Sequence, residues 1–407
     1  MIIMLKIAWR NLWRNPRRTL VLVITIAVAI FGYLGTTAFI KGFKHQMLAS
    51  TLDLNGGHIR IAAQGFQDNP VLRSNIRRPQ AVYAALDTMP GLVYAPQVIF
   101  TGMINSSETA AGVIITGIDA AREKQVSIID DILVRGSYLS SGAENTILLG
   151  EALAQRLDVR IGEKVVLMAN DLNNDISSDV FRLTGVFRST STEYDKSMVF
   201  IPIDRARRFV GFDENISAVS IRLEQDRDLE PTTEAIRAAL GEEKLEVLTW
   251  KERFPILMIL LQSFDAFTYI FIAIVFTAIA FSIINTFLMV IYERIIEFGI
   301  MMAIGVLPGR IRRMLLLETV FVTLAGSVAG VALTAIGLGY WMHHGLDLSI
   351  IAEGLGKFGI GALVYPVLET GDLIFGLTSI FIIVLLSVLY PAFKAGRFKP
   401  VDAINFV

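Results

Sequence analysis

Four long apolar runs constrain the fold of this chain more than any other feature of its sequence. They are Leu20–Ile40, Ala266–Ile291, Met314–Trp341 and Leu373–Tyr390. About 20 apolar residues of α-helix cross a hydrocarbon core about 30 Å thick. Inside that core every backbone polar group must be hydrogen-bonded within its own segment, which favours helices. The runs therefore predict four membrane-spanning helices, and we interpret the first as a retained anchor rather than a cleaved secretory signal.

The composition excludes several classes of function. Of the 407 residues, 53% are hydrophobic and 18% charged, which is too apolar for a water-soluble protein. The net charge of -1 gives no electrostatic support for binding nucleic acid. The absence of cysteine excludes disulfides, thiolate metal sites and a thiol nucleophile. No phosphate-binding loop occurs, since the nearest string, GLGKFG around Lys357, has neither the spacing nor the Ser or Thr. If ATP drives this protein, another chain must bind it.

Lys and Arg in the flanks of the four runs predict the orientation. They are Lys6, Arg10, Arg14, Arg17 and Arg18 before the first run, Arg294, Arg310, Arg312 and Arg313 between the second and third, and Lys394, Arg397 and Lys399 after the fourth. Short cytoplasmic flanks are enriched in these residues. Both termini are therefore expected in the cytoplasm, and the large segment between the first two runs outside it.

The segment from about residue 55 to 250 is expected to form an α+β domain. Short β-rich runs bounded by turn residues are His58–Ala62, Val113–Thr116, Val165–Met168, Phe181–Val186, Met198–Ile201 and Ala218–Leu223. Helical stretches between them are Gln80–Thr88, Glu151–Leu157, Asp204–Val210 and Thr232–Leu240. The predicted fold is thus an α-helical membrane protein with four transmembrane helices and a large α+β domain inserted between the first and second.

No catalytic or metal site is recognisable in this domain. The chain has 4 scattered histidines, of which His343 and His344 have no acid at metal-ligand spacing. Asp130-Asp131 and Glu242-Glu243 are typical of exposed acid pairs rather than a buried dyad. The polar stretch Asn170–Asp179 is either a solvated hairpin tip or a docking loop for a partner.

Residues 4–18 predict an amphipathic helix in the membrane interface. Leu5, Ala8, Trp9, Leu12 and Trp13 form its apolar stripe. Its tryptophans are expected at headgroup level and its bases toward anionic lipid. A contact with a partner is a second interpretation.

Several residues in the runs are expected to mediate helix packing. The small residues are Gly32 and Gly35 in the first run and Gly326 and Gly330 in the third, and a buried Asn285 in the second could hydrogen-bond across a helix pair. Glu318, near the start of the third helix, is expected to interact with the positive end of the helix dipole. Trp250–Gln262 predicts a stalk that pairs with the continuation of the first helix.

Tyr292–Arg313, YERIIEFGIMMAIGVLPGRIRR, lies between the second and third runs. Glu293 and Glu297 are four residues apart and are expected on one helical face. Ile296, Ile300 and Ile304 follow at the same spacing, and Gly305, Pro308 and Gly309 are expected to end the helix. The segment is either an interfacial hairpin with solvated charges or a handle for a cytoplasmic partner.

The resulting organisation has nine segments. They are an interfacial helix (1–18), the first span and its stalk (19–54), the α+β domain (55–250), a stalk and second span (251–291), the charged helix (292–313), the third span (314–341), an external loop (342–371), the fourth span (372–391) and a cytoplasmic tail (392–407).

This order of parts resembles the FtsX-like, MacB-type family of ABC transporter permeases over nearly the whole chain. AWRNLWRNPRRT, NTFLMVIYERIIEFGIMMAIGVLPGRIRRMLLLE and YPAFKAGRFKPVDAI are similar to the family's first helix, coupling region and tail. ITGID, ILLGEALAQRLDVRIGEKVVL and FRLTGVFRSTSTEYDKSMVFIPIDRA are similar to its external domain. Size and GFKHQMLASTLDLNGGHIRI most resemble the lipoprotein-releasing subunits, although the carrier-recruiting subunit has a longer, Pro-containing hook where this chain has Asn170–Asp179.

The resemblance implies a permease dimer, homomeric or heteromeric, in the inner membrane of a bacterium, paired with cytoplasmic ABC ATPases that bind ATP and Mg. It favours the handle interpretation and places Glu293, Arg294, Glu297, Gly299, Ala303, Gly305 and Arg310 on the coupling element. Motion of that element would reach the external domain through the stalks, as in a rigid-body switch. The leading expectation is extraction of lipoprotein or another amphipathic substrate from the outer leaflet. Alternatives are efflux of a drug, peptide or siderophore through a periplasmic adaptor, and signalling to a cell-wall hydrolase.

Overall fold

The computed structural model describes residues 2–140, 145–225, 228–241, 244–356, 361 and 363–397. The chain divides into two compact units, of which the first comprises Met1–Lys44, Leu261–Asp347 and Leu363–Val407 and the second His45–Leu260 and Leu348–Ala362. Lys357, the Glu242-Glu243 pair, Lys399 and the rest of the tail from residue 398 lie outside the described residues.

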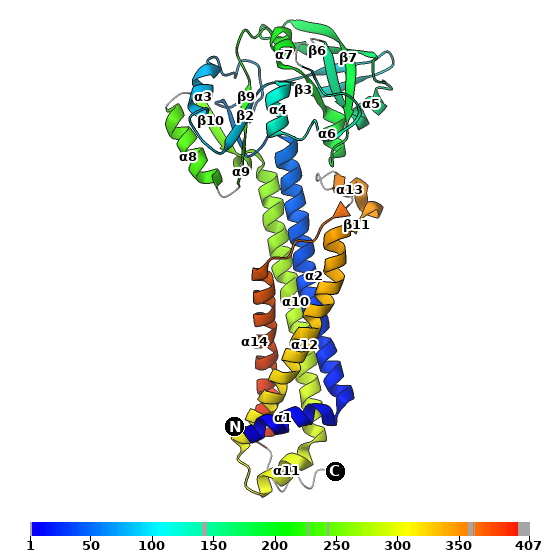
Figure 1. Ribbon diagram of the computed structural model, residues 1–407, viewed down its shortest axis with the longest axis vertical. Helices are drawn as coiled ribbons and strands as arrows, with labels where there is room; N and C mark the ends of the chain where they lie inside the picture. Colours follow the sequence, from blue (N-terminus) through cyan, green and yellow to red (C-terminus); the bar gives the residue numbers. More distant parts are fainter. Residues whose placement is uncertain are drawn as a thin grey trace. The chain divides into compact units, whose positions relative to one another are not determined.

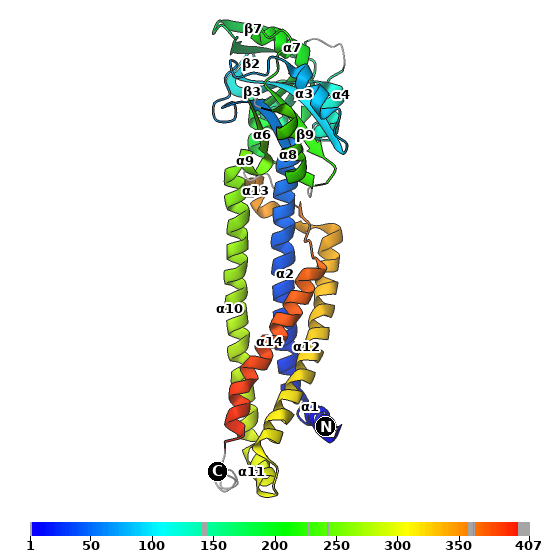
Figure 2. The ribbon, with the colours of Figure 1, turned by 90° about the vertical axis from the view of Figure 1, so that its left-hand side faces the viewer.

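The first unit is a helical bundle (Figures 1 and 2). Its long helices are α2 (Pro16–Leu54), α10 (Pro255–Glu293), α12 (Pro308–His344) and α14 (Thr370–Ala395). All four are long and apolar enough to cross a membrane, which confirms the four predicted spans. Each helix extends past its apolar run at both ends, since helical hydrogen bonding continues into the polar flanks. Two shorter helices, α1 (Ile2–Arg14) and α11 (Ile295–Ala303), complete this unit together with the short β11–β12 pair (Leu346–Asp347 and Leu363–Val364).

The expected N-terminal helix over residues 4–18 is divided in the structure. α1 ends at Arg14 and α2 begins at Pro16, so that Arg17 and Arg18 belong to the first turn of α2. Proline lacks an N–H and is disfavoured inside a helix but well suited to the first helical position, which explains the break.

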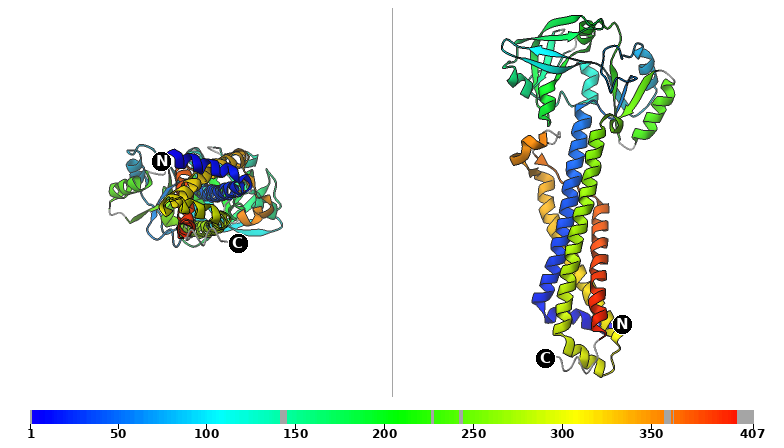
Figure 3. Two further views of the ribbon diagram at one scale, coloured as in Figure 1. Left: turned by 90° about the horizontal axis from the view of Figure 1, so that it is seen from below. Right: turned by 180° about the vertical axis from the view of Figure 1, so that it is seen from behind.

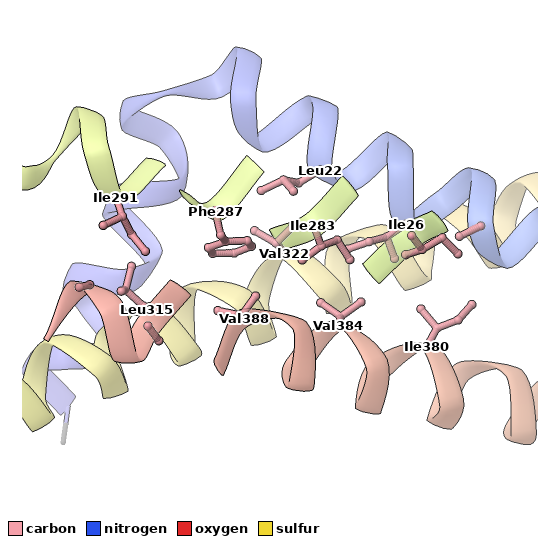
Figure 4. Packing of buried hydrophobic residues seen from close by; sticks show 14 of the residues in the cluster. Leu22, Ile26, Ile283, Phe287, Ile291, Leu315, Val322, Ile380, Val384 and Val388 are labelled. Atoms are coloured by element: carbon pink, nitrogen blue, oxygen red, sulfur yellow. The ribbon is translucent and has the colours of Figure 1, made fainter. Parts of the chain in front are cut away.

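Apolar side chains from all four long helices form the core of the bundle (Figure 4). The buried residues labelled in the figure are Leu22 and Ile26 on α2, Ile283, Phe287 and Ile291 on α10, Leu315 and Val322 on α12, and Ile380, Val384 and Val388 on α14. Because lipid tails are as apolar as these side chains, close packing rather than exclusion of water holds such a core together.

Glycines in α12 allow a close approach to α2 in this core. A Cβ at Gly326 would lie 2.7 Å from the Cβ of Ile26, and one at Gly330 would lie 2.8 Å from the Cβ of Ile30. Gly32 and Gly35 of α2 differ, because a Cβ at either would meet nothing within 4 Å among the described residues. These two glycines therefore do not have the predicted packing role within this chain.

Asn285 also differs from its prediction. It is exposed on α10 rather than buried between helices, and its side chain has no hydrogen bond within the described part of the chain. The buried positions around it, Ile283 and Phe287, occupy the face of α10 that packs into the core, so the intervening residue points away from the bundle.

The second unit is built on a 10-stranded mixed sheet (Figure 1). Its strands are β1 (Ile59–Ala63), β2 (Leu92–Asn105), β3 (Ala110–Ile118), β4 (Leu133–Gly136), β5 (Thr146–Gly150), β6 (Lys164–Asn170), β7 (Ile176–Phe187), β8 (Met198–Pro202), β9 (Ala218–Leu223) and β10 (Leu245–Thr249). Their order is β10-β1-β9-β2-β3-β8-β5-β7-β4, with β6 pairing to β2 and β7. β3 and β8 pair in parallel, as do β5 and β7, and the other pairs are antiparallel.

Helices accompany the sheet. They are α3 (Pro79–Leu86), α4 (Ala120–Val126), α5 (Glu151–Arg156), α6 (Thr192–Ser197), α7 (Ile203–Val210), α8 (Leu229–Leu240), α9 (Trp250–Arg253) and α13 (Ala352–Gly356). Each of the six runs expected as strands overlaps a strand, and each of the four expected helices overlaps a helix. The longest strand, β2, lies outside the six expected runs, and Pro96 within it pairs opposite Val219 of β9.

The expected stalk at Trp250–Gln262 is interrupted. α9 ends at Arg253 after a capping box in which Thr249 and Glu252 satisfy each other's backbone N–H groups, and Pro255 then starts α10. The helices α2 and α10 run alongside one another (Figure 3). Within the first unit they contact through Phe43 and Phe264, whose ring centroids are 5.3 Å apart, and through a 2.6 Å ion pair between Lys44 and Asp265.

The carboxyl end of α2 lies in the second unit. The helix ends at Leu54, and Gly56 and Gly57 follow with φ values of +76° and +86°. Such left-handed conformations are tolerated by glycine, which is why this pair can end the helix.

Candidate coupling site

The chain turns between α10 and α11 at Arg294, so the expected single helix from Tyr292 is wrong. α10 ends at Glu293, Arg294 has φ -106° and ψ 14°, and α11 begins at Ile295. Glu293 and Glu297 therefore lie on different helices. No glycine or proline marks this break in the sequence. The side chain of Arg294 is buried at this break. Tertiary contacts of this kind can override local helix propensity.

α11 ends at Ala303, ahead of Gly305, whose φ is +95°. Pro308 and Gly309 do not belong to the end of α11. Pro308 is the first residue of α12 and Gly309 the second. Arg310 lies in the first turn of α12 and is exposed, as are Ala303 and Gly305, whereas Gly299 is buried.

Arg294 forms a buried ion pair with Glu318 of α12. Its Nη1 donates to both carboxylate oxygens of Glu318, at 3.3 and 3.4 Å, and each residue is only 8% exposed. The Nδ2 of Asn11 on α1 donates to the same carboxylate. The guanidinium also lies 5.2 Å from the ring centroid of Phe298 on α11. Removing one partner of such a pair costs about 3–5 kcal/mol, because the other charge is left buried.

The role expected for Glu318 is therefore wrong. α12 begins at Pro308, so Glu318 is well beyond its first turn, whereas the dipole effect is confined to about one turn. Its partners come from two distant parts of the chain, Asn11 and Arg294, which sequence spacing could not reveal.

The two acids of the YERIIE motif are also paired within the chain. Glu293 forms an ion pair with Arg18 of α2, and Glu297 forms one with Arg14 of α1. The Oε2 of Glu297 also accepts a 3.0 Å hydrogen bond from Nε of Arg294. Burial by itself would raise the pKa of Glu297, but the hydrogen bond and charge of Arg294, followed by those of Arg14, outweigh it and hold this pKa below its ordinary value.

These interactions join five helices at one corner of the bundle. α1 contributes Asn11 and Arg14, α2 contributes Arg18, and the turn, α11 and α12 contribute Arg294, Glu297 and Glu318. We call this set, with Glu293 of α10, the coupling corner. Sequence analysis treated the N-terminal arginines as lipid-facing charges and missed their pairing to the acids. The available signal was that two flanks expected on the same side of the membrane carry opposite charges, arginines in one and Glu293 and Glu297 in the other.

Beside Glu297, α11 has an exposed face of apolar side chains. Ile296, Ile300 and Ile304 are 46%, 50% and 76% exposed and follow one another at intervals of four residues. This confirms their shared face as far as Ile300, while Ile304 lies just past the end of the helix. Adjacent exposed apolar residues of this kind are typical of surfaces that a partner covers.

The second unit holds a separate groove. The expected loop Asn170–Asp179 is the tip of the β6–β7 hairpin, and Ile176 within it is 73% exposed. A groove of about 720 Å³ beside the hairpin is lined by Met103 and Met168 among others. Among the described residues no cluster of three or more His, Asp or Glu could hold a metal ion.

Comparison with known proteins finds two family matches. A MacB-like periplasmic core domain matches residues 19–239, and the C-terminal region of FtsX-like permeases matches residues 269–400. The lipoprotein-releasing system transmembrane protein LolE of Haemophilus influenzae is 22% identical over 98% of both chains. The pyoverdine export ATP-binding/permease protein PvdT of Pseudomonas fluorescens is 26% identical over 98% of this chain and 58% of its own length. The crystal structure of the periplasmic region of MacB from Actinobacillus actinomycetemcomitans covers 50% of this chain and 93% of that structure, with 14% identity and a TM-score of 0.35.

Proposed function

Because the chain belongs to the FtsX-like, MacB-type family of ABC transporter permeases, we propose that it transmits motion from a separate cytoplasmic ABC ATPase to the 55–250 domain. The substrate is a lipoprotein or another amphipathic molecule taken from the outer leaflet of a bacterial inner membrane. In this proposal α11 and both termini face the cytoplasm, and the large domain faces the periplasm. ATP and Mg are bound by the ATPase, not by this chain.

One observation carries the proposal: α11 has an exposed apolar face, and Glu297 beside that face is ion-paired within the chain. The exposed isoleucines at 296, 300 and 304 provide a surface that an ATPase can cover. Glu297 pairs with Arg14, and Glu293 just before α11 pairs with Arg18. A force applied to α11 therefore acts on α1 through Glu297, and on α2 through Glu293 at the adjoining end of α10. This differs from a surface hairpin, whose charges would be left to solvent.

An apolar surface on α10 supports the proposed substrate class. Phe267, Ile270, Phe271 and Ile274 are all exposed and have the i, i+3, i+4, i+7 spacing of a single helical face. A face of this kind could accept acyl chains. Among the relatives, LolE is named as part of a lipoprotein-releasing system, which favours a lipidated substrate.

Asn285 supports the proposal of a second permease. Polar residues within spans almost always face protein rather than lipid, yet Asn285 points away from this bundle. A second permease packed on this part of α10 would supply a hydrogen-bonding partner. The open space beside Gly32 and Gly35 leaves room for close helix approach as well.

Efflux through a periplasmic adaptor is the second candidate function. The groove beside the β6–β7 hairpin favours it, since exposed Met103, Met168 and Ile176 could bury an apolar side chain of an adaptor. PvdT, which is named as an export protein, is similar over nearly all of this chain. The same groove could instead receive a periplasmic carrier of released lipoprotein.

The test is copurification. The tagged chain is extracted in mild detergent and its partners are identified by mass spectrometry. We expect an ABC ATPase, lost on Ile300→Glu because a charge then lies in the buried centre of the interface. Ile350→Glu is the matched control, because Ile350 is also exposed but lies outside α11. Lipidated proteins in the sample favour extraction, and an adaptor favours efflux. The proposal that an ATPase binds α11 would be refuted if no ABC ATPase copurified with the parent protein. It would also be refuted if both variants lost the ATPase equally.

A further inference from the structure

An apolar groove of about 410 Å³ lies where α1 and the start of α2 meet α12. Its lining includes Trp9, Trp13, Leu20, Phe321 and Ala325. The ring of Trp9 meets those of Trp13 and Phe321 edge-on, with centroids 6.2 and 5.5 Å away. The two tryptophans are nevertheless 52% and 70% exposed. The volume is within the range of about 300–1,000 Å³ that is usual for small-molecule sites.

One arginine that lines this groove has no ion pair with an acidic side chain among the described residues. Arg14 pairs with Glu297 and Arg18 pairs with Glu293. Arg17, which lines the groove, is exposed and has no ion pair within the part of the chain that the structure describes. An occupant that complements both features has an apolar body and a negative charge beside it.

We propose that this groove binds an anionic phospholipid, with an acyl chain against the two tryptophans and a headgroup phosphate on Arg17. Tryptophan is enriched at headgroup level, and arginine there is attracted to anionic lipid. Free phosphate would leave the apolar walls empty, and an apolar peptide would leave Arg17 without a counter-charge. Other residues of α1, Asn11 and Arg14, belong to the coupling corner. A bound lipid therefore holds α1 between the bilayer and that corner.

Fluorescence quenching tests the site in the full-length protein. The chain has 4 tryptophans, so Trp250→Phe and Trp341→Phe leave only the two that line the groove. The protein in detergent is titrated with phosphatidylglycerol or phosphatidylcholine carrying brominated acyl chains. We expect saturable quenching, with phosphatidylglycerol at least about fivefold tighter, the ratio expected from one arginine–headgroup attraction.

Three variants distinguish a specific lipid site in the groove from nonspecific attraction of anionic lipid to the basic residues of α1 and α2. Arg17→Gln should bring phosphatidylglycerol to the affinity of phosphatidylcholine. Arg10→Gln, the same charge change on an exposed residue of α1 outside the groove, should leave the preference intact. Ala325→Phe should fill the groove and reduce quenching by both lipids while Arg17 remains. Equal effects of the two arginine variants, or equal quenching by the two lipids in the parent protein, would overturn the proposal.

Discussion

The two ends of α2 are held by different chemistry. At its start, Arg18 pairs with an acid, and the neighbouring Arg294–Glu318 pair is buried with both charges matched. At its carboxyl end, in the second unit, Arg222 pairs with Asp53 of α2 at 2.7 Å, and two further arginines bind backbone. The carbonyl oxygen of Asn55 accepts from Nη2 of Arg60 at 3.4 Å and from Nη2 of Arg253 at 3.3 Å.

At the carboxyl end of α2, some buried hydrogen-bond donors have no partner among the described residues. Arg253 is 5% exposed, yet its Nε and Nη1 have no hydrogen-bond partner among the described residues. Burial lowers its pKa well below the ordinary value, and the charge of Arg60 lowers it further. The carbonyl oxygen of Leu54 also accepts from the hydroxyl of Tyr194. Positive groups at a helix carboxyl end are favoured by its unsatisfied carbonyls. The start of α2 therefore depends on charge pairs, whereas its end combines one ion pair, at Asp53, with capping by arginines that are not fully paired.

The largest expected effect is at the start of α2. Glu318→Ala leaves Arg294 buried without its acid and should lower the free energy of unfolding by about 3–5 kcal/mol. Denaturant titration in detergent measures this. The double variant Arg294→Met with Glu318→Leu is the control, since apolar replacement of both partners should recover most of the loss. A single variant as stable as the parent would mean that the pair does not hold this corner.

Between its two ends, α2 is held by packing against α12. Gly330→Leu should cost about 1–3 kcal/mol, because the new Cβ would lie 2.8 Å from the Cβ of Ile30. Gly35→Leu is matched in chemistry but meets nothing within 4 Å among the described residues, and should change stability by less than about 0.5 kcal/mol. Similar losses in both would contradict the close contact of α2 with α12.

A smaller effect is expected at the carboxyl end of α2. Arg253→Met removes a single 3.3 Å hydrogen bond, worth about 0.5–1.5 kcal/mol, but also removes a buried charge with unpaired donors. These two effects oppose each other. The free energy of unfolding should therefore change by less than about 1.5 kcal/mol, which is far less than the loss expected for Glu318→Ala. A loss of similar size in the two variants would remove the distinction between the two ends.

Lowering the pH should change stability with opposite sign near the two ends of α2. This is the smallest of the expected effects. The folded pKa of Glu297 is lowered, so its contribution is present above the unfolded value of about 4.3 and is lost as pH falls through the folded value. Burial raises the pKa of Glu123 on α4, which lies near Arg60, so stability there increases as pH falls through that raised value. Hydrogen exchange, corrected for its intrinsic pH dependence, should show α11 loosening in acid while α4 does not. Glu297→Gln should abolish the change in α11, and a common response in both helices would contradict the assignment.

Much of the architecture was predictable from local patterns. Apolar length revealed the four spans, and alternation with turn residues located six strands. What local pattern could not supply was long-range pairing. β2 lies outside the six expected runs. The break at Arg294 has no glycine or proline to mark it, and the partner of Arg294 there, Glu318, is on α12. Asn285 was expected to be buried because spacing shows which residues share a face but not which face meets a neighbour. For the same reason, the arginines at 14 and 18 were not matched to the acids at 293 and 297.

The central claim is that α11 and α2 move as one body when the ATPase acts. Since the chain has no cysteine, Ile24→Cys on α2 and Leu307→Cys after α11 allow two spin labels without background. Leu307 is exposed and is not one of the isoleucines that the ATPase is proposed to cover. Pulsed electron paramagnetic resonance would measure the distance between them in the complex with the copurified ABC ATPase, with and without a non-hydrolysable ATP analogue. The account predicts an unchanged, narrow distance in the parent protein, and a shifted or broadened one when Glu293→Gln and Glu297→Gln remove both ion pairs. The same nucleotide-dependent change in both proteins would show that these ion pairs do not couple α11 to α2.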